Sequence, residues 1–217
     1  MSGQDFDHDL IAAAFRIAAE TGWARLTIVD AARAAGLSLG EVRARFPGKH
    51  TLLRRFGAML DQAALAADSG EGPVRDRLFD LLMGRFDAMK PHREGLGALL
   101  RSLPGDPATA LALGCGTRQS MRWMLQAAGV STAGPRGELR VRGLIGVWIW
   151  AMRAFARDET DDLAPTMAAL DKALSRAHAA AAWLGGERTL AAGGDEAMMD
   201  ETGTDKTGTD EAEGEEG

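Results

Sequence analysis

The sequence lacks tyrosine and has a single cysteine among its 217 residues. Because Cys115 is alone, an internal disulfide and a zinc site built from several cysteines are both excluded. Aromatic residues make up only 6% of the chain, and few stretches alternate apolar and polar residues with the period of two that is typical of strands. These absences favour an all-α protein.

The chain also lacks the residue patterns of metal sites and common active sites. Its histidines, His8, His50, His92 and His178, have no second ligand at metal-binding spacing. The sequence GCG at 114–116 lacks the Lys-Ser/Thr ending of a phosphate loop. No Ser-His-acid set or carboxylate pair stands out. We therefore expect no metal, no cofactor and no enzymatic activity.

Long hydrophobic runs are missing as well. The most apolar run, 143–152, is about half as long as a membrane span and has Arg142 and Arg153 at its ends. The first residues, MSGQDFDHD, are acidic and polar, unlike a secretory signal or a transit peptide. We therefore expect a cytoplasmic protein with no stable membrane insertion.

Charge is present but unevenly distributed. The formal net charge is −6, yet residues 187–217 hold eleven acidic and two basic residues, which leaves +3 for residues 1–186. Residues 23–55 hold seven basic and two acidic residues. This asymmetry indicates a local anionic partner. The acidic segment 187–217 has too few apolar residues to offset the entropy of ordering, so we expect a disordered tail.

Apolar residues at helical spacing predict a series of helices, with side-chain caps at Asp7, Thr27, Ser38 and Asp106. The expected helices cover about 8–21, 27–35, 38–46, 49–67, 74–90, 92–102, 107–128, 136–157 and 165–184, and Gly185-Gly186 is expected to end the last one. Turn-forming residues at 68–73 mark an internal boundary. The predicted organisation is a domain at 1–68, a second helical domain at 73–186 and the tail at 187–217.

The segment 27–49, TIVDAARAAGLSLGEVRARFPGK, predicts two short helices joined by a tight turn at Gly36. This layout is a helix-turn-helix, whose second helix enters the DNA major groove. Glu41 in that second helix has two possible roles. Its spacing to Ser38 matches a capping box, which we favour; as a base reader it would accept a hydrogen bond from a cytosine amino group.

Residues 10–56 resemble the N-terminal domain of TetR-type transcriptional repressors. The matching residues are Gly22-Trp23, Thr27-Ile28, Ala31-Ala32, Ala35-Gly36-Leu37-Ser38, Gly40, Val42, Phe46, Lys49 and Leu52. The resemblance implies an all-α TetR-like fold, with an N-terminal three-helix helix-turn-helix domain followed by a helical ligand-binding and dimerisation domain. It also implies a homodimeric, ligand-responsive repressor that binds a near-palindromic operator in double-stranded DNA.

The same resemblance implies which residues contact DNA. Thr27 and Lys49 would contact the DNA backbone. The residues that would face the groove are Leu39, Glu41, Arg43, Ala44 and Arg45. Ser38 and Gly40, at the start of the second helix, favour close approach of a phosphate. The chain departs from the family pattern at Leu39, at Glu41 and at Arg43, which replaces the usual tyrosine.

The second predicted domain concentrates large, soft side chains. Such residues are typical of a core and a dimer interface, and they also line pockets for apolar ligands. We predict a pocket for a small apolar ligand lined by Met83, Phe86, Trp123, Met124, Trp148 and Met152.

A second, shorter resemblance concerns the stretch WIWAMRAFARDETDDLAPTMAALDKAL. It is similar to a lipid-binding family with the TetR architecture that assists ubiquinone biosynthesis. The matching features are an apolar helix, the acidic turn 158–162, and a helix with Thr166, Leu170 and Asp171. The alternative function is therefore a lipid-binding accessory protein that no longer reads DNA. The basic balance of residues 23–55 favours DNA binding.

Overall fold

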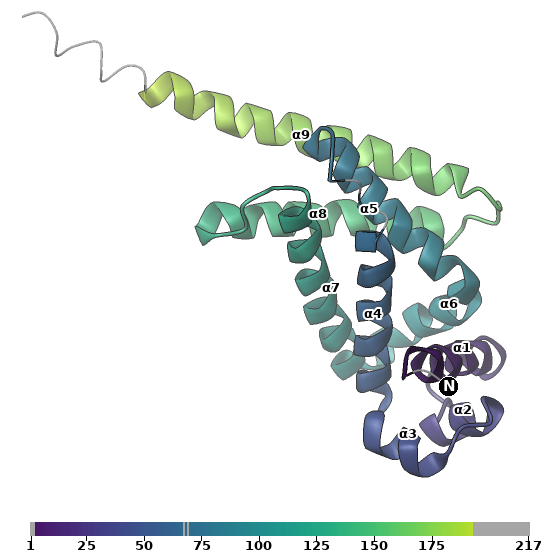
Figure 1. The fold of residues 1–217 in the computed structure, drawn as a ribbon. Helices are drawn as coiled ribbons and strands as arrows, with labels where there is room; N and C mark the ends of the chain where they lie inside the picture. The colour runs from purple at the N-terminus through teal and green to yellow at the C-terminus, as the bar shows by residue number, and fades with distance from the viewer. Residues whose placement is uncertain (1–2, 67, 69, 193–217) are drawn as a thin grey trace, which may run out of the picture. The chain divides into compact units, whose positions relative to one another are not determined.

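The computed structural model describes residues 3–66, 68 and 70–192, with side chains described up to residue 180. Its elements are α1 (Gly3–Thr21), α2 (Ile28–Ala34), α3 (Leu39–Arg45), α4 (Lys49–Ala66), α5 (Val74–Met89), η1 (Lys90–His92), α6 (Arg93–Ser102), η2 (Leu103–Gly105), α7 (Pro107–Ala127), α8 (Gly134–Phe155) and α9 (Ala164–Ala192) (Figure 1). No strand occurs within these ranges. The predicted all-α class is therefore confirmed.

The first helix is longer than its expected cap allowed. It begins at Gly3, so Asp7 lies inside α1, where it is buried and paired with Arg45 and Arg55. The expectation that Asp7 caps the helix was wrong, because its partners come from segments about 40 residues further along the chain. The helix ends before Gly22, whose φ of +87° is a backbone conformation that glycine adopts without strain.

Caps were predicted correctly where a side chain bonds its own helix. Thr27 precedes α2 and its Oγ1 accepts a hydrogen bond from the backbone N–H of Asp30 at 3.1 Å. Asp106 caps α7 in the same way, accepting from the N–H of Thr109 at 3.0 Å. At the last helix the prediction was wrong: Gly185-Gly186 lie within α9, which continues to Ala192. Residues 187–192 of the predicted tail lie in α9, and residues 193–217 lie outside the described residues.

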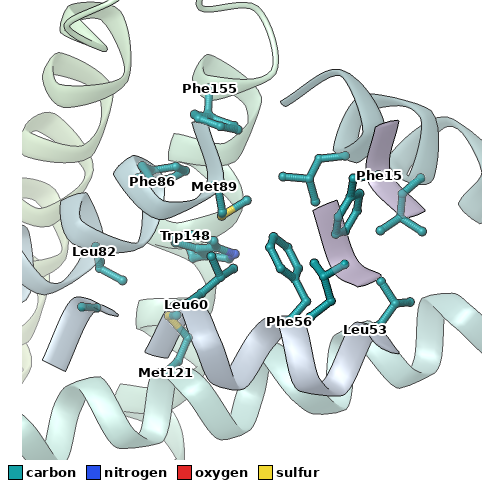
Figure 2. Close-up of a cluster of buried hydrophobic side chains, with 14 of the residues drawn as sticks. Phe15, Leu53, Phe56, Leu60, Leu82, Phe86, Met89, Met121, Trp148 and Phe155 are labelled. Carbon is teal, nitrogen blue, oxygen red and sulfur yellow. The ribbon is translucent and has the colours of Figure 1, made fainter. Parts of the chain in front are cut away.

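The buried apolar side chains form one connected cluster, and α4 contributes to it along most of its length (Figure 2). At one end Phe56 packs on Phe15 of α1, with ring centroids 4.6 Å apart. Further along α4, Leu60 lies near Trp148 of α8 (Figure 2). The Trp148 ring stacks on the ring of Phe86 of α5, with ring centroids 4.5 Å apart. Because burying each such side chain stabilises the fold by about 1.5–3 kcal/mol, α4 is held firmly against α1 at one end and against the residues of α5 and α8 further along.

A close backbone contact joins α1 to α6. A Cβ atom added at Gly95 would collide with the backbone of Phe15, so only glycine permits this approach. Beside it, the His92 ring lies 5.4 Å from the rings of both Phe15 and Phe56. Helix α1, on which α2 packs, is thus held directly against α6.

Candidate nucleic-acid interface

The turn between α2 and α3 has the geometry expected of a helix-turn-helix. Gly36 adopts φ +66°, and the N–H of Leu37 bonds the carbonyl of Ala32 at 2.9 Å. Val42 and Phe46, four residues apart, are 2% and 1% exposed and anchor one side of α3 in the core. The opposite side of α3 is therefore fixed in an outward orientation.

That outward side is formed by residues that the sequence assigned to the DNA groove. Leu39 is 45% exposed, and Gly40, Glu41, Arg43 and Ala44 are exposed as well. Gly40 has open space around it, since an added Cβ would meet only the Ser38 hydroxyl oxygen at an ordinary 3.8 Å. The exposed surface of α3 thus carries the apolar Leu39 beside the charged Glu41 and Arg43, and Gly40 leaves the helix backbone accessible between them.

The expected capping box between Ser38 and Glu41 does not form. Ser38 precedes α3 and is its N-cap by backbone position, but its side chain makes no capping hydrogen bond. Glu41 has neither a hydrogen bond nor an ion pair within the described part of the chain. The structural role that the sequence favoured for Glu41 is therefore wrong, and its carboxylate stands free on the surface of α3.

Arg45 does not share that open surface. Its Nη2 lies 2.6 Å from Asp7 Oδ1 and donates to the carbonyl of Gly3 at 2.9 Å, while its guanidinium stacks 4.6 Å from the Phe6 ring. The other Asp7 oxygen pairs with Arg55 Nε at 3.0 Å. The structure therefore places Arg45 in the packing between α1 and α3, away from the predicted groove residues.

The remaining predicted DNA contacts lie around the start and end of the helix-turn-helix. Lys49 Nζ donates to the carbonyls of Trp23 and Ala24 at 3.2 and 3.4 Å, which holds its charge near the loop before α2. The Thr27 hydroxyl, besides capping α2, donates to Asp30 at 2.6 Å. Arg43 donates to the carbonyl of Pro47 at 3.0 Å. Thr27 and Arg43 are exposed, so water or phosphate oxygens compete for their donors, whereas Lys49 is partly buried beside Trp23.

Most of the basic charge in this region is not neutralised. Of the seven basic residues at 23–55, only Arg45 and Arg55 pair with a carboxylate in the described residues. The basic side chains without an acidic partner there are Arg25, Arg33, Arg43, Lys49 and Arg54. Such a positive surface around an exposed helix attracts a polyanion.

The residues predicted to line a ligand pocket are mostly part of the core. Met83, Phe86, Met124 and Trp148 are buried, and Met152 is partly buried against them. The sixth residue, Trp123, is 52% exposed on α7. Five of the six residues thus belong to the same packed region, whereas Trp123 lies on the surface.

A buried ion pair within this core was missed at the sequence level. Arg85 of α5 is 5% exposed and pairs with Asp61 of α4, whose other oxygen accepts from Ser120 of α7 at 2.7 Å. The Arg85 guanidinium lies 5.0 Å from the Trp148 ring. Burial lowers the pKa of Arg85 to about 10, so the side chain stays protonated at neutral pH. The available signal was that Arg85 continues the helical spacing of Leu78, Leu81, Leu82 and Met89.

The acidic turn that carries the second resemblance has a structural role here. Asp158 is 2% exposed and accepts hydrogen bonds from the N–H and hydroxyl groups of both Thr160 and Thr166. Burial raises the pKa of Asp158, but these hydrogen bonds outweigh burial and lower the pKa to about 2. Leu170 is buried, and Asp171 pairs with Arg75 of α5. The turn thus fixes the start of α9 in place.

Within the described residues no three His, Cys, Asp or Glu side chains are grouped as metal ligands would be. The described helices include none with the length and apolar character needed to cross a bilayer.

Comparison with known proteins identifies the fold. No family model matches the sequence, and no curated protein is significantly similar to it. Among solved structures, a TetR transcriptional regulator from Nitrosomonas europaea matches with a TM-score of 0.63 and 19% identity over 80% of this chain and 98% of that one. A TetR-family regulator from Streptomyces coelicolor matches with a TM-score of 0.60 and 24% identity over 85% of each chain. A TetR transcriptional regulator from Rhodococcus sp. RHA1 matches with a TM-score of 0.58 and 18% identity over 81% of this chain and 97% of that one. The chain therefore has the fold of the TetR-type transcriptional regulators.

Proposed function

We propose that this protein is a DNA-binding transcriptional regulator of the TetR type, a ligand-responsive repressor that acts as a dimer in the cytoplasm. The observation that carries the proposal is the outward face of α3. Val42 and Phe46 anchor α3 in the core, while Leu39, Gly40 and Arg43 are exposed and several basic side chains nearby in the sequence have no ion pair in the described structure. Residues 1–68 would form the DNA-binding domain, and residues 73–186 the ligand-binding and dimerisation domain.

In this proposal α3 enters the major groove and its outward side chains meet the base edges. Lys49, Arg54 and Arg33 neutralise phosphates on either side, so binding weakens as salt rises. Gly40 brings the backbone close to the DNA because it carries no side chain. Arg45 acts differently from the groove residues: its bonds to Asp7 and Gly3 set the angle of α3 on α1.

A two-fold dimer would present two copies of α3 to a near-palindromic operator. The exposed side of α8 supports this assembly, because apolar and small residues recur there at spacings of three and four. They are Leu139, Gly143, Gly146, Ile149 and Trp150. A strip of this kind fits a second copy of the same helix, since glycines allow close approach and the large side chains fill the space beside them.

A small apolar ligand would act from the second domain. The proposed lining is the part of the core that contains Met83, Phe86, Met124, Trp148 and Met152, where Trp148 lies beside Leu60 of α4 (Figure 2). Because α4 also packs on α1 through Phe56, a ligand that favours one arrangement of these helices changes the position of α3. The size of the response is limited by the difference in ligand affinity between the two arrangements.

The test separates DNA binding from folding with a single methyl group. Gly40→Ala adds a Cβ that the protein itself accommodates, and helix propensity raises stability by up to about 1 kcal/mol. On DNA the same methyl occupies the space between α3 and the duplex. We expect affinity for an operator, chosen by selection from random DNA, to fall about tenfold, the equivalent of about 1.4 kcal/mol.

The matched control is Gly57→Ala on α4, where an added Cβ also meets nothing within 4 Å. We expect this variant to keep full operator affinity in fluorescence anisotropy. Equal affinities for wild type, Gly40→Ala and Gly57→Ala would contradict the placement of α3 against DNA. A wild-type protein that selects no sequence and co-purifies with isoprenoid lipid would instead favour the lipid-binding function.

A further inference from the structure

Glu41 is an exposed acid in the middle of the surface proposed to meet DNA. It lies in the first turn of α3, between the exposed Leu39 and Arg43. Arg45 is four residues further on, which is the favourable spacing for a Glu–Arg ion pair along a helix. That pair does not form, because Asp7 and the Gly3 carbonyl hold the Arg45 guanidinium on the other side of α3. The capture of Arg45 by Asp7 therefore leaves Glu41 without a partner in the described structure.

A free carboxylate on this face can meet only a few groups of a DNA duplex favourably. Ionised carboxylate is an acceptor without a donor, and it is repelled by phosphates. In the major groove the donors are the N4 amino group of cytosine and the N6 amino group of adenine. Adenine also presents the N7 acceptor beside its amino group, which opposes a carboxylate, whereas cytosine presents no acceptor there. Cytosine is thus the base that fits Glu41.

We infer that Glu41 determines base specificity by accepting a hydrogen bond from the N4 amino group of one cytosine in each half-site. The inference rests on the proposed function, since it assumes that α3 lies in the major groove. It assigns Glu41 a part in recognition distinct from that of Arg43, whose guanidinium is suited to guanine. It also gives Asp7 an indirect part, because Asp7 withholds the arginine that would otherwise neutralise Glu41.

Two substitutions at Glu41 distinguish recognition of a base from simple repulsion between the carboxylate and the DNA phosphates. Glu41→Ala removes the acceptor, and Glu41→Gln keeps the shape while adding an amide that pairs with adenine N6 and N7. The exposed position of Glu41 means that neither substitution disturbs the core. The control is Glu20→Gln, which removes an exposed acidic charge from α1, on a different helix from the proposed reading face.

The experiment is selection of bound sequences from random double-stranded DNA by the full-length wild type and the three variants. We expect one position in each half-site to prefer cytosine roughly five- to tenfold in the wild type, a contribution at the lower end of those made by base contacts. Glu41→Ala loses this preference and Glu41→Gln shifts it toward adenine, with all other positions unchanged. Glu20→Gln keeps the wild-type sequence preference.

The outcomes separate the two proposals. If the wild type selects a sequence and both Glu41 variants select the same one, the inference about Glu41 is overturned while the proposed function stands. If the wild type enriches no sequence at all, the proposed function itself fails. An equal rise in affinity for every sequence in Glu41→Gln, without a changed base preference, identifies Glu41 as a source of repulsion only and also overturns the inference.

Discussion

Some carboxylates in this protein bond residues three positions away, and others bond basic residues about 40 positions away. Thr27 and Asp30, and Asp106 and Thr109, are three residues apart, so their capping was predictable. Asp7 instead bonds Arg45 and Arg55, which no local pattern indicates. The roles of Glu41 and Arg45 depend on that distant contact: the cap expected of Glu41 does not form, and Arg45 bonds Asp7, while its contact with DNA stays a prediction.

Asp158 provides a prediction at the same scale. Its folded pKa of about 2 lies below the ordinary value of 3.8, so the ionised form is stabilised by folding. The resulting stability is fully present above about pH 4 and is lost as pH falls through about 2. Its size is about 2 kcal/mol, because each unit of pKa shift corresponds to about 1.4 kcal/mol.

Urea unfolding at several pH values measures this contribution. We expect Asp158→Asn to be less stable than wild type by about 2 kcal/mol at pH 7, with the difference shrinking toward pH 2. Asp162→Asn in the same turn is the control, because Asp162 is exposed and accepts a single backbone hydrogen bond from Ala164. A difference for Asp158→Asn that stays constant over this pH range would show that packing, and not ionisation, causes the loss.

At the scale of helices, periodicity predicted the elements well but not which of them touch. Each predicted helix is present, and apolar side chains at helical spacing form its buried face, as Phe56 and Leu60 do on α4. The contact between α1 and α6 was not foreseeable, since Gly95 has no local signal that distinguishes it from Gly97 two residues later. Only the structure shows that the Phe15 backbone lies against Gly95, while Gly97 meets nothing but the flexible end of Arg101.

The different surroundings of Gly95 and Gly97 allow the packing of α6 on α1 to be tested with two substitutions on the same helix. Gly95→Ala forces α6 away from α1, and we expect a loss of roughly 1–3 kcal/mol or more in the free energy of unfolding, as for other overpacked sites. Gly97→Ala displaces only the Arg101 guanidinium and gains helix propensity, so its stability stays equal to wild type or rises by up to about 1 kcal/mol. Equal stabilities of the two variants in urea unfolding would contradict the close packing of α1 on α6.

At the scale of the whole molecule, the proposed function requires two copies, and the exposed side of α8 is where we expect them to meet. The spacing of Leu139, Gly143, Gly146 and Trp150 was not recognised from sequence, because periodicity alone does not tell an exposed apolar strip from a buried one. In the structure α8 buries Val141, Leu144, Val147 and Trp148 on its other side. Between its exposed arginines, the outer side of α8 thus presents a second apolar strip that is open to a partner.

Gly146→Glu tests this surface without disturbing the subunit. A Cβ added at Gly146 meets nothing within 4 Å in the monomer, so we expect the subunit to fold normally. In a dimer joined through α8 the new carboxylate enters the contact between the two copies of the strip, where burying its charge is unfavourable. We expect dimerisation to weaken by at least about 2 kcal/mol, roughly thirtyfold in dissociation constant.

Gly114→Glu on α7, at an exposed glycine with equally open surroundings, should leave the dimer intact. Sedimentation over a range of protein concentrations measures both constants. Since an operator with two half-sites needs both copies of α3, Gly146→Glu should also lose preference for the full operator over a single half-site. A dimer that is unchanged by Gly146→Glu would place the subunit contact on another surface.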